Sequence, residues 1–258
     1  MRFTKMEGLG NDYIYFNCMR DAPENLPELA VRLSDRHFGV GADGIICIRP
    51  GRTGDFTMEM YNADGSRGAM CGNGIRCVGK YVYDQGLTRK TCLTIDTDAG
   101  ARYLQLHVRG GKVERVTVDM GVPKLRAPLD IQGERVHPVD MGNPHGVVFC
   151  PEPEEIDLET QGAALGRDPA FPGEWNIEFA AAEARDRIRV RVWERGSGPT
   201  MACGTGACAA LAAAVKTGQC DRRAVVALPG GELEVEWERE SGHIWLTGPA
   251  RTVFQGEI

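Results

Sequence analysis

The sequence predicts an α/β protein of the α+β type, made of two homologous domains that each combine strands with a central helix. Three observations predict it: an internal repeat, a glycine-flanked cysteine at the same point of each repeat, and strands on both sides of one helix in each half. The 258 residues suffice for two domains. A hydrophobic fraction of 42% and a charged fraction of 26% indicate a globular protein with a sizeable core.

The internal repeat defines the domains. MYNADGSRGAMCGNGIRCVGKYVYDQG aligns with VWERGSGPTMACGTGACAALAAAVKTG, which places Cys71 on Cys203 at a sequence offset of 203 − 71 = 132. The same offset aligns LGNDYIYF with MGNPHGVVF and places Asn11 on Asn143. One offset shared by two separate segments indicates two homologous domains. We expect them at residues 1–122 and 123–249, with a linker at 123–128 and an extra C-terminal strand, 250–258, that returns to the first domain.

Each half follows the same order of elements. Apolar segments bounded by Gly, Asp or Pro predict strands at 13–17, 44–48 and 56–61, and at 147–150, 176–180 and 187–194. Glycine-rich turns then lead into helices at 74–85 and 205–217, which stop at Gly86 and Gly218. Further strands are expected at 93–97, 101–109 and 112–120, and at 223–228, 232–239 and 243–246. An additional helix is expected at 28–38.

Composition excludes several classes of function. The net charge is −6 and the basic residues are scattered, so neither nucleic acid nor an anionic membrane is an expected partner. The N-terminus lacks a signal-peptide pattern and no run of about 18 apolar residues occurs, so a cytoplasmic protein is expected. Nine cysteines, an odd number in a long chain, favour reduced thiols over disulfides. Because no CxxC pair occurs, no metal site is expected.

Two cysteines carry the predicted chemistry. Cys71 and Cys203 each precede a helix, where the positive helix end lowers a thiol pKa and the backbone N–H groups bind anions. Two such elements on related domains predict an interdomain cleft with a thiol on each wall. One thiol would remove the α-proton of an amino acid and the other would return a proton. The other seven cysteines are interpreted as buried small apolar residues, namely Cys18, Cys47, Cys77, Cys92, Cys150, Cys208 and Cys220.

Other polar residues allow two interpretations each. Asn11 and Asn143 follow glycine in turns, where Asn serves either the backbone or a ligand. His145 is either a turn histidine or a group that tunes a thiol. Glu194 and Arg195 form either a solvated ion pair or part of the cleft, where an arginine suits a substrate carboxylate.

Six segments together resemble the diaminopimelate epimerase family. They are KMEGLGNDYIYFN, RHFGVGADGIICI, YNADGSRGAMCGNGIRC, MGNPHGVVF, WNIEFA and WERGSGPTMACGTGACA, in family order over nearly the whole chain. The resemblance implies two domains of one fold, each a mostly antiparallel β-sheet wrapped around a central α-helix. It implies conversion of LL-diaminopimelate to the meso form, for lysine and cell-wall precursor synthesis, without pyridoxal phosphate or metal.

The resemblance also implies roles for individual residues. Cys71 and Cys203 would be the acid–base pair, assisted by His145 and Glu194. The reacting carboxylate would be bound by the amides of Gly72, Asn73, Gly204 and Thr205. The distal end of the substrate would be recognised by Asn11, Asn62, Asn143, Asn176 and Arg195. The expected partners are a small-molecule substrate and, in a homodimer, a second copy of the chain.

The chain departs from the family pattern at two positions, and three rival functions stay open. Gly146 stands where members often carry cysteine, and Gly44 where some carry glutamine. The rivals are a related racemase acting on histidine or another amino acid, a proline-racemase-like enzyme, and a non-catalytic amino-acid-binding protein. Arg195 with the asparagine set favours a substrate with a second amino-acid end, and a mere binding protein needs neither cysteine.

Overall fold

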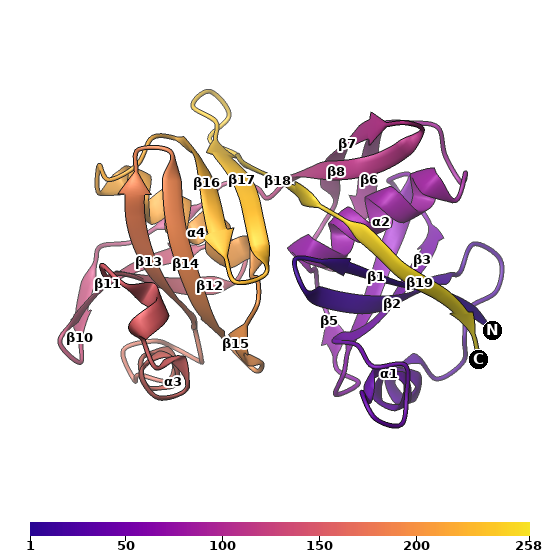
Figure 1. Cartoon of the computed structure of the whole chain (residues 1–258), viewed down its shortest axis with the longest axis horizontal. Coiled ribbons are helices and arrows are strands. Elements are labelled where there is room, and N and C mark those ends of the chain that lie inside the picture. Colours follow the sequence, from indigo (N-terminus) through magenta and orange to yellow (C-terminus); the bar gives the residue numbers. More distant parts are fainter. The chain divides into compact units, whose positions relative to one another are not determined.

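Two units, each with one buried long helix among its strands, make up the computed structural model, which describes residues 1–258. The first unit comprises residues 1–118 and 248–258, and the second comprises residues 119–247. Both are rich in strands, and each contains one long helix among them (Figure 1). The chain is therefore a mixed α+β protein, as the sequence predicts.

The first unit places its strands around one helix. Neighbouring strands pair antiparallel except β2 with β3 and β4 with β6, which are parallel. The parallel pairs require long connections, and the connection from β4 to β6 carries helix α2 (Gly72–Asp84). The strands are β1 (Arg2–Gly8), β2 (Asn11–Asn17), β3 (Gly44–Pro50), β4 (Phe56–Asn62), β5 (Arg67–Gly68), β6 (Cys92–Asp96), β7 (Arg102–Arg109) and β8 (Lys112–Asp119).

Over β11 to β18 the second unit repeats the pairing order of β1 to β8, and β9 and β10 both pair with β11. Helix α4 (Gly204–Lys216) follows β15 as α2 follows β5, and the parallel pairs are β12 with β13 and β14 with β16. Its strands are β9 (Lys124–Leu125), β10 (Leu129–Ile131), β11 (Glu134–Asp140), β12 (Pro144–Phe149), β13 (Asn176–Ala184), β14 (Arg187–Glu194), β15 (Gly198–Thr200), β16 (Arg223–Leu228), β17 (Gly231–Trp237) and β18 (Ile244–Pro249). Strands that the constant sequence offset places on each other therefore pair with equivalent neighbours in the two units.

Both long helices are buried on most of their faces. Every residue of α4 from Gly206 to Ala214 is buried, which alanine permits because its small side chain lets strands approach closely. In α2 the residues from Gly72 to Gly79 are buried. Each helix ends before a glycine in the left-handed region, Gly86 (φ 73°) or Gly218 (φ 75°), as the sequence predicts.

Shorter helical elements pack beside the strands of each unit. In the first unit α1 (Leu26–Ser34) packs Leu26, Leu29 and Leu33 into a core with β2 and β3. In the second unit a 3-10 helix (Pro153–Glu155), a π-helix (Leu158–Gly162) and α3 (Ala163–Gly166) precede β13. There, Phe171 and Trp175 stack with their ring centroids 4.2 Å apart.

The C-terminal strand β19 (Arg251–Glu257) pairs antiparallel with β1 and belongs to the first unit. Two local expectations were wrong. The helix expected at 28–38 ends at Ser34, because the Asp35 carboxylate accepts the backbone N–H groups of His37 and Phe38 and folds the chain into a turn. The segment expected as a linker, 123–128, contains β9, which pairs with β11.

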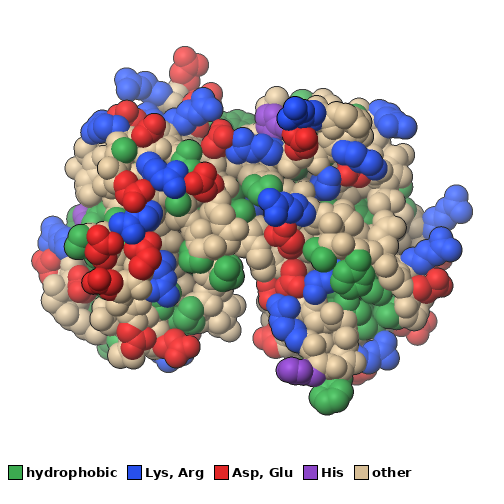
Figure 2. Space-filling model, viewed as in Figure 1, with side chains coloured by type: hydrophobic (Ala, Val, Ile, Leu, Met, Phe, Trp, Pro, Cys, Tyr) green, Lys and Arg blue, Asp and Glu red, His purple; other side chains and the backbone are tan.

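None of the helices has the length and apolar character needed to cross a membrane. On the face drawn in Figure 2, Lys and Arg side chains alternate with Asp and Glu side chains over both units, and no extended patch of one sign appears there.

Candidate active site

Cys71 is the N-terminal cap of α2. Its backbone is extended (φ −128°, ψ 120°), and its Sγ accepts the N–H of Gly74 at 3.3 Å. The cap therefore satisfies one donor of the first helical turn through sulfur, where Ser, Thr or Asp would use oxygen. The thiol also contacts Asn11 Oδ1 at 3.2 Å, and the residue is partly exposed.

A network of charged side chains, partly exposed at Arg36 and Asp43, orients Asn11 against this thiol. Asn11 Nδ2 donates to Asp43 Oδ2 at 2.7 Å, which turns Oδ1 towards Cys71. Arg36 binds both Asp43 and Asp12 at 2.9 Å, and Lys5 binds Asp12 at 2.8 Å. Because Asn11 Oδ1 is an acceptor, the geometry is that of a Cys71 thiol donating its proton to the amide.

Arg76 anchors the first turn of α2 from inside the protein. Its guanidinium is fully buried and donates to Gly72 O and Asn73 Oδ1, both at 3.0 Å, and to Pro249 O at 3.1 Å. Burial lowers the pKa of this side chain. The arginine thus holds the glycine-rich turn that follows Cys71.

Cys203 caps α4 in the same way but in a more enclosed place. Its Sγ accepts the N–H of Gly206 at 3.3 Å and lies 3.4 Å from Thr205 Oγ1, and the residue is only 5% exposed. Burial, followed by the carboxylates of Glu194 and Glu178, raises the pKa of this thiol well above its usual value. The expected lowering of the thiol pKa is therefore wrong for Cys203, because burial outweighs the helix end and its two hydrogen bonds.

A chain of hydrogen bonds links Cys203 to a buried carboxylate. Asn143 Nδ2 donates to Thr205 Oγ1 at 3.3 Å, and Asn143 Oδ1 lies 3.1 Å from His145 Nε2. His145 Nδ1 in turn lies 2.7 Å from Glu178 Oε1. His145 and Glu178 are both fully buried. The chain of hydrogen bonds therefore runs from the interior of the second unit to the sulfur of Cys203.

The remaining candidates of the second unit surround the end of β14. Asn176 uses both ends of its amide on the backbone: Nδ2 donates to Pro144 O and Oδ1 accepts the N–H of Arg195, each at 2.9 Å. The Arg195 side chain is exposed, with one long contact of 3.4 Å to Glu174 O. Asn176 therefore ties the start of β12 to the segment that carries Arg195.

The structure groups the candidate residues by unit. In the first unit Cys71, Gly72, Asn73 and Asn11 lie together at the start of α2, whereas the Asn62 amide donates to Ser66 Oγ at 3.0 Å within its own turn. In the second unit Cys203, Gly204, Thr205, Asn143 and His145 lie together at the start of α4. Glu194 lies close enough to Cys203 to raise the pKa of its thiol.

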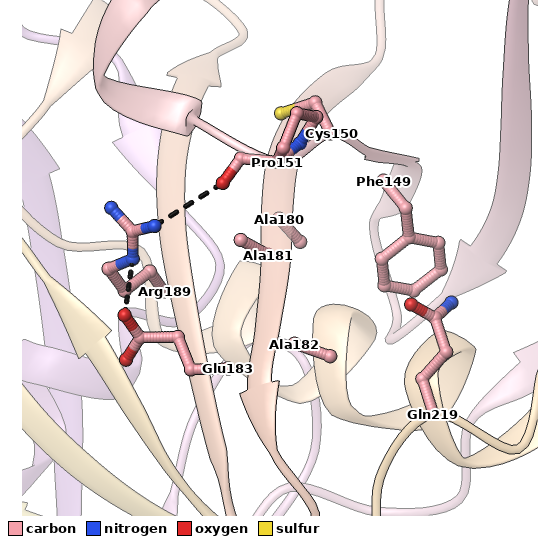
Figure 3. A pocket seen from close by; sticks show the side chains of 9 residues that line it. All are labelled: Phe149, Cys150, Pro151, Ala180, Ala181, Ala182, Glu183, Arg189 and Gln219. Atoms are coloured by element: carbon pink, nitrogen blue, oxygen red, sulfur yellow. Dashed lines mark hydrogen bonds and ion pairs between the residues drawn. The ribbon is translucent and has the colours of Figure 1, made fainter.

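Other features of the surface lack this chemistry. A cavity of about 340 Å³ lies on the second unit, lined by Cys150, Glu183 and Arg189 among others (Figure 3). Arg189 closes one side of it through an ion pair with Glu183 and a hydrogen bond to Pro151 O. Burial raises the pKa of Cys150 to about 11, so its thiol stays protonated. No group of three or more His, Cys, Asp or Glu side chains is arranged to hold a metal ion.

Comparison with known proteins decides the family. The family model described as diaminopimelate epimerase matches residues 3–126 and 138–253 of this chain. The chain belongs to the diaminopimelate epimerase family. It is 47% identical over 275 residues to the diaminopimelate epimerase of Acetivibrio thermocellus, covering 100% of this chain and 98% of that protein. It is 49% identical over 262 residues to that of Bacteroides thetaiotaomicron, with the same coverage.

Solved structures share the fold at low sequence identity. A predicted epimerase from Pseudomonas aeruginosa has a TM-score of 0.75 at 15% identity, covering 100% of this chain and 98% of that one. A probable proline racemase from Agrobacterium radiobacter has a TM-score of 0.70 at 18% identity, covering 100% and 92%. These likenesses support the α+β fold described above for this chain.

Packing explains the two departures from the family pattern. A Cβ on Gly146 would lie 2.9 Å from Val136 Cγ1 and 3.0 Å from Ile177 Cδ1, so a cysteine there would require repacking. A Cβ on Gly44 would lie 2.2 Å from Tyr61 O, so that position has no room for a side chain. Neither glycine contributes a functional group to the site.

Sequence reasoning missed Asp43, Arg76 and Glu178, which contact residues of the predicted site. Asp43 and Arg76 position Asn11 and the first turn of α2, and Glu178 contacts His145. A signal for Glu178 was present: it is a single carboxylate inside the apolar strand NIEFAA, and the repeat alignment places it on Ile46. Asp43 had no comparable signal, because a loop aspartate is ordinary.

Proposed function

We propose that this chain interconverts LL- and meso-2,6-diaminopimelate, with Cys71 and Cys203 as the two acid–base groups. The observation that carries the proposal is the pair of thiols that cap matched helices in a member of the diaminopimelate epimerase family. Relatives named diaminopimelate epimerase that match over the full chain support the activity. The enzyme is then an isomerase of amino-acid biosynthesis whose meso product serves lysine and peptidoglycan-precursor synthesis.

The two thiols are proposed to act on opposite faces of one α-carbon, without pyridoxal phosphate or a metal. One thiolate removes the α-proton, and the opposite thiol donates a proton to the other face. The buried Cys203, whose pKa is raised, suits the donor role at neutral pH. In the reverse direction the roles exchange, so each sulfur is the base for one stereoisomer.

The helix N-termini are proposed to stabilise the charge that develops on the reacting carboxylate. The first turns of α2 and α4, at Gly72, Asn73, Gly204 and Thr205, combine backbone N–H groups with the positive helix end. Such preorganised donors stabilise a developing anion in proportion to how well water is excluded. Buried Arg76, which holds the first turn of α2, supports such preorganisation.

His145 and Glu194 are proposed to assist the thiols, and a separate set to recognise the distal end of the substrate. That set is Asn11, Asn62, Asn143, Asn176 and Arg195. The exposed guanidinium of Arg195 supports a role in binding a second carboxylate, for which its planar fork is suited. Asn11 and Asn143 also contact residues of the reacting end, so we propose that each faces both ends of the site.

The test is exchange of the α-proton into D2O over a panel of amino acids. We expect exchange and epimerisation of LL- and meso-diaminopimelate, and far slower exchange of histidine and proline. Fast exchange of histidine with none of diaminopimelate would favour the related racemase function. Tight binding without any exchange would favour a binding protein.

Location and assembly are proposed on narrower grounds. None of the nine cysteines forms a disulfide, which supports a reducing compartment and hence the cytoplasm. A homodimer is proposed as the assembly in solution. Light scattering coupled to gel filtration tests it, and a mass near 28.2 kDa would contradict it.

A further inference from the structure

Glu178 is a buried carboxylate on β13, next to His145 on β12. We propose that Glu178 is a positioning residue, which holds the His145 imidazole doubly protonated and thereby fixes the direction of the hydrogen bonds that end on the Cys203 sulfur. The inference deepens the proposed function and rests on the proposed acid–base role of Cys203.

An ionised Glu178 needs a cation beside it, because it is buried. Both Glu178 and His145 are 0% exposed, and Glu178 Oε1 lies 2.7 Å from His145 Nδ1. Glu178 Oε2 has no hydrogen-bond partner. An ionised carboxylate at this depth is costly unless a cation balances it. A His145 ring protonated on both nitrogens supplies that balance.

The second ring nitrogen also faces an acceptor. His145 Nε2 lies 3.1 Å from Asn143 Oδ1, while Asn143 Nδ2 donates to Thr205 Oγ1 at 3.3 Å. A neutral imidazole carries one N–H and can donate to one acceptor, whereas an imidazolium donates to both. The doubly protonated ring is therefore the form that fits its two neighbours.

The direction of the remaining hydrogen bonds follows from the ring. Thr205 Oγ1 accepts from Asn143, so its own proton is available for Cys203 Sγ at 3.4 Å. The sulfur then has two donors, the Thr205 hydroxyl and the Gly206 N–H. Donors on sulfur stabilise the thiolate relative to the thiol. They oppose burial and the carboxylates of Glu194 and Glu178, which raise the Cys203 pKa.

The first unit shows that packing does not require a carboxylate at this position. In the repeat alignment Ile46 replaces Glu178 and Tyr13 replaces His145. A Cβ on Gly74 of α2 would meet Ile46 Cδ1 at 2.8 Å, just as one on Gly206 of α4 would meet Glu178 Oε1 at 2.6 Å. An apolar side chain fills the equivalent space, so the charge of Glu178 serves something other than packing.

The decisive variant is Glu178→Gln, which keeps the shape and removes the charge. Without its counter-ion the imidazole becomes neutral, and the Asn143 amide turns its N–H towards Nε2. The Thr205 hydroxyl then donates its hydrogen bond to Asn143 Oδ1 instead of to the Cys203 sulfur. Cys203 then loses a donor. The rate of alkylation by iodoacetamide at Cys203, resolved by peptide mass spectrometry over pH, should report a pKa raised by about one unit. In turnover, kcat should fall about tenfold with KM nearly unchanged.

The sign of this shift separates the proposal from a simple charge effect. As a negative charge alone, Glu178 raises the Cys203 pKa, so its removal would lower it. A lowered or unchanged Cys203 pKa in Glu178→Gln would overturn the proposal.

Two further variants serve as controls. Glu183→Gln lies on the same strand, but Glu183 pairs with Arg187 and Arg189 outside this network, so the Cys203 alkylation profile should not change. If Glu178 acts through His145, adding Glu178→Gln to His145→Gln should change the profile little further. Additive shifts would contradict a role through His145.

Nitrogen NMR of the unmodified chain keeps the proposal testable if Glu178→Gln does not fold. With ¹⁵N-labelled histidine, assigned through His145→Gln, both ring nitrogens of His145 should carry protons at neutral pH. A neutral His145 ring would refute the inference whatever the turnover. A doubly protonated ring, with the expected Cys203 shift but no exchange of any α-proton, would refute the proposed function instead.

Discussion

The two candidate cysteines cap matched helices but have different neighbours. Cys71 is partly exposed and faces the acceptor Asn11 Oδ1, whereas Cys203 is buried and faces the hydroxyl of Thr205. Burial and two nearby carboxylates raise the pKa of Cys203. A symmetric reaction would therefore be carried out by two groups with unequal surroundings, and single substitutions can distinguish them.

Removing either sulfur should stop epimerisation without stopping all proton chemistry. In Cys71→Ala or Cys203→Ala the returning proton has no donor on one face, so LL-to-meso turnover should fall by at least about a thousandfold. Each variant should still exchange the α-proton of one stereoisomer, the one facing its remaining thiol. Cys→Ser at either position should also be severely impaired, because a hydroxyl is a much weaker acid than a thiol. Proton NMR in D2O measures exchange and turnover together.

Cys208→Ala is the matched control for these variants. Cys208 lies on α4, five residues beyond Cys203, and is fully buried. The Cys208→Ala variant should keep near-normal turnover. Its free energy of unfolding should fall by only roughly 1 kcal/mol, because the substitution leaves a small cavity. Near-normal turnover by Cys71→Ala or Cys203→Ala would contradict the two-base mechanism.

Arg195→Lys should separate substrate recognition from stability. The Arg195 side chain is exposed, so the melting temperature should hardly change. Lysine keeps the charge but loses the planar fork that binds a carboxylate at two points. We expect kcat/KM for diaminopimelate to fall at least about tenfold, the loss expected from a charged hydrogen bond. Arg187→Lys, on β14, should leave kcat/KM unchanged, and equal behaviour of the two variants would argue against a distal role for Arg195.

At the scale of elements, Asp96 at the end of β6 holds the loop between β3 and β4. Its carboxylate accepts the N–H groups of Arg52, Thr53 and Gly54 at 2.7, 2.9 and 3.0 Å, and the Thr53 hydroxyl at 2.8 Å. These donors hold the pKa of the buried Asp96 carboxyl far below its usual range. The carboxylate substitutes for backbone pairing where the hairpin turns.

Asp96→Asn should destabilise the first unit in a pH-dependent way. An amide cannot accept all of these bonds, so the free energy of unfolding at pH 7 should fall by about 2 kcal/mol. Because the folded pKa is depressed, the carboxylate stabilises the fold above its unfolded pKa of about 3.9 and loses that effect as pH falls towards the folded pKa. Urea unfolding should therefore show a smaller difference at pH 3 than at pH 7. A difference that is the same at both pH values would count against this role.

At the scale of the whole molecule, the chain repeats one pairing scheme and closes it with β19. This last strand pairs with β1, so the chain that leaves the first unit at residue 118 returns to it at residue 248. Each unit carries one capping cysteine of the proposed pair. A reaction that uses both sulfurs therefore depends on both units.

Mild oxidation should inactivate the enzyme reversibly. If both sulfurs reach one α-carbon, they are close enough to form a disulfide that blocks the site. Diamide should abolish turnover, a dithiol reductant should restore it, and peptide mapping should find Cys71 joined to Cys203. Cys71→Ala serves as the mapping control and should yield no such peptide. Full activity after oxidation with both cysteines intact would show that the sulfurs do not meet.

The sequence by itself determined the features that depend on local order and on repetition. The offset between Cys71 and Cys203, the glycine stops at Gly86 and Gly218, and the strands on both sides of each long helix were readable because caps, stops and apolar strands have local signatures. The same residues sufficed to recognise the family. The sequence could not predict the end of α1 at Ser34, because that depends on hydrogen bonds made by Asp35.

Only the tertiary structure decided the environment of each functional group. A helix N-terminus predicts a lowered thiol pKa, but the burial of Cys203 and its carboxylate neighbours raise it, and burial is a property of packing. Likewise Glu178 reaches His145 because β12 and β13 pair in parallel, although the two residues lie far apart in the sequence. The sequence predicts which sulfurs react, whereas contacts between distant strands determine the hydrogen bonds and charges of the side chains around them.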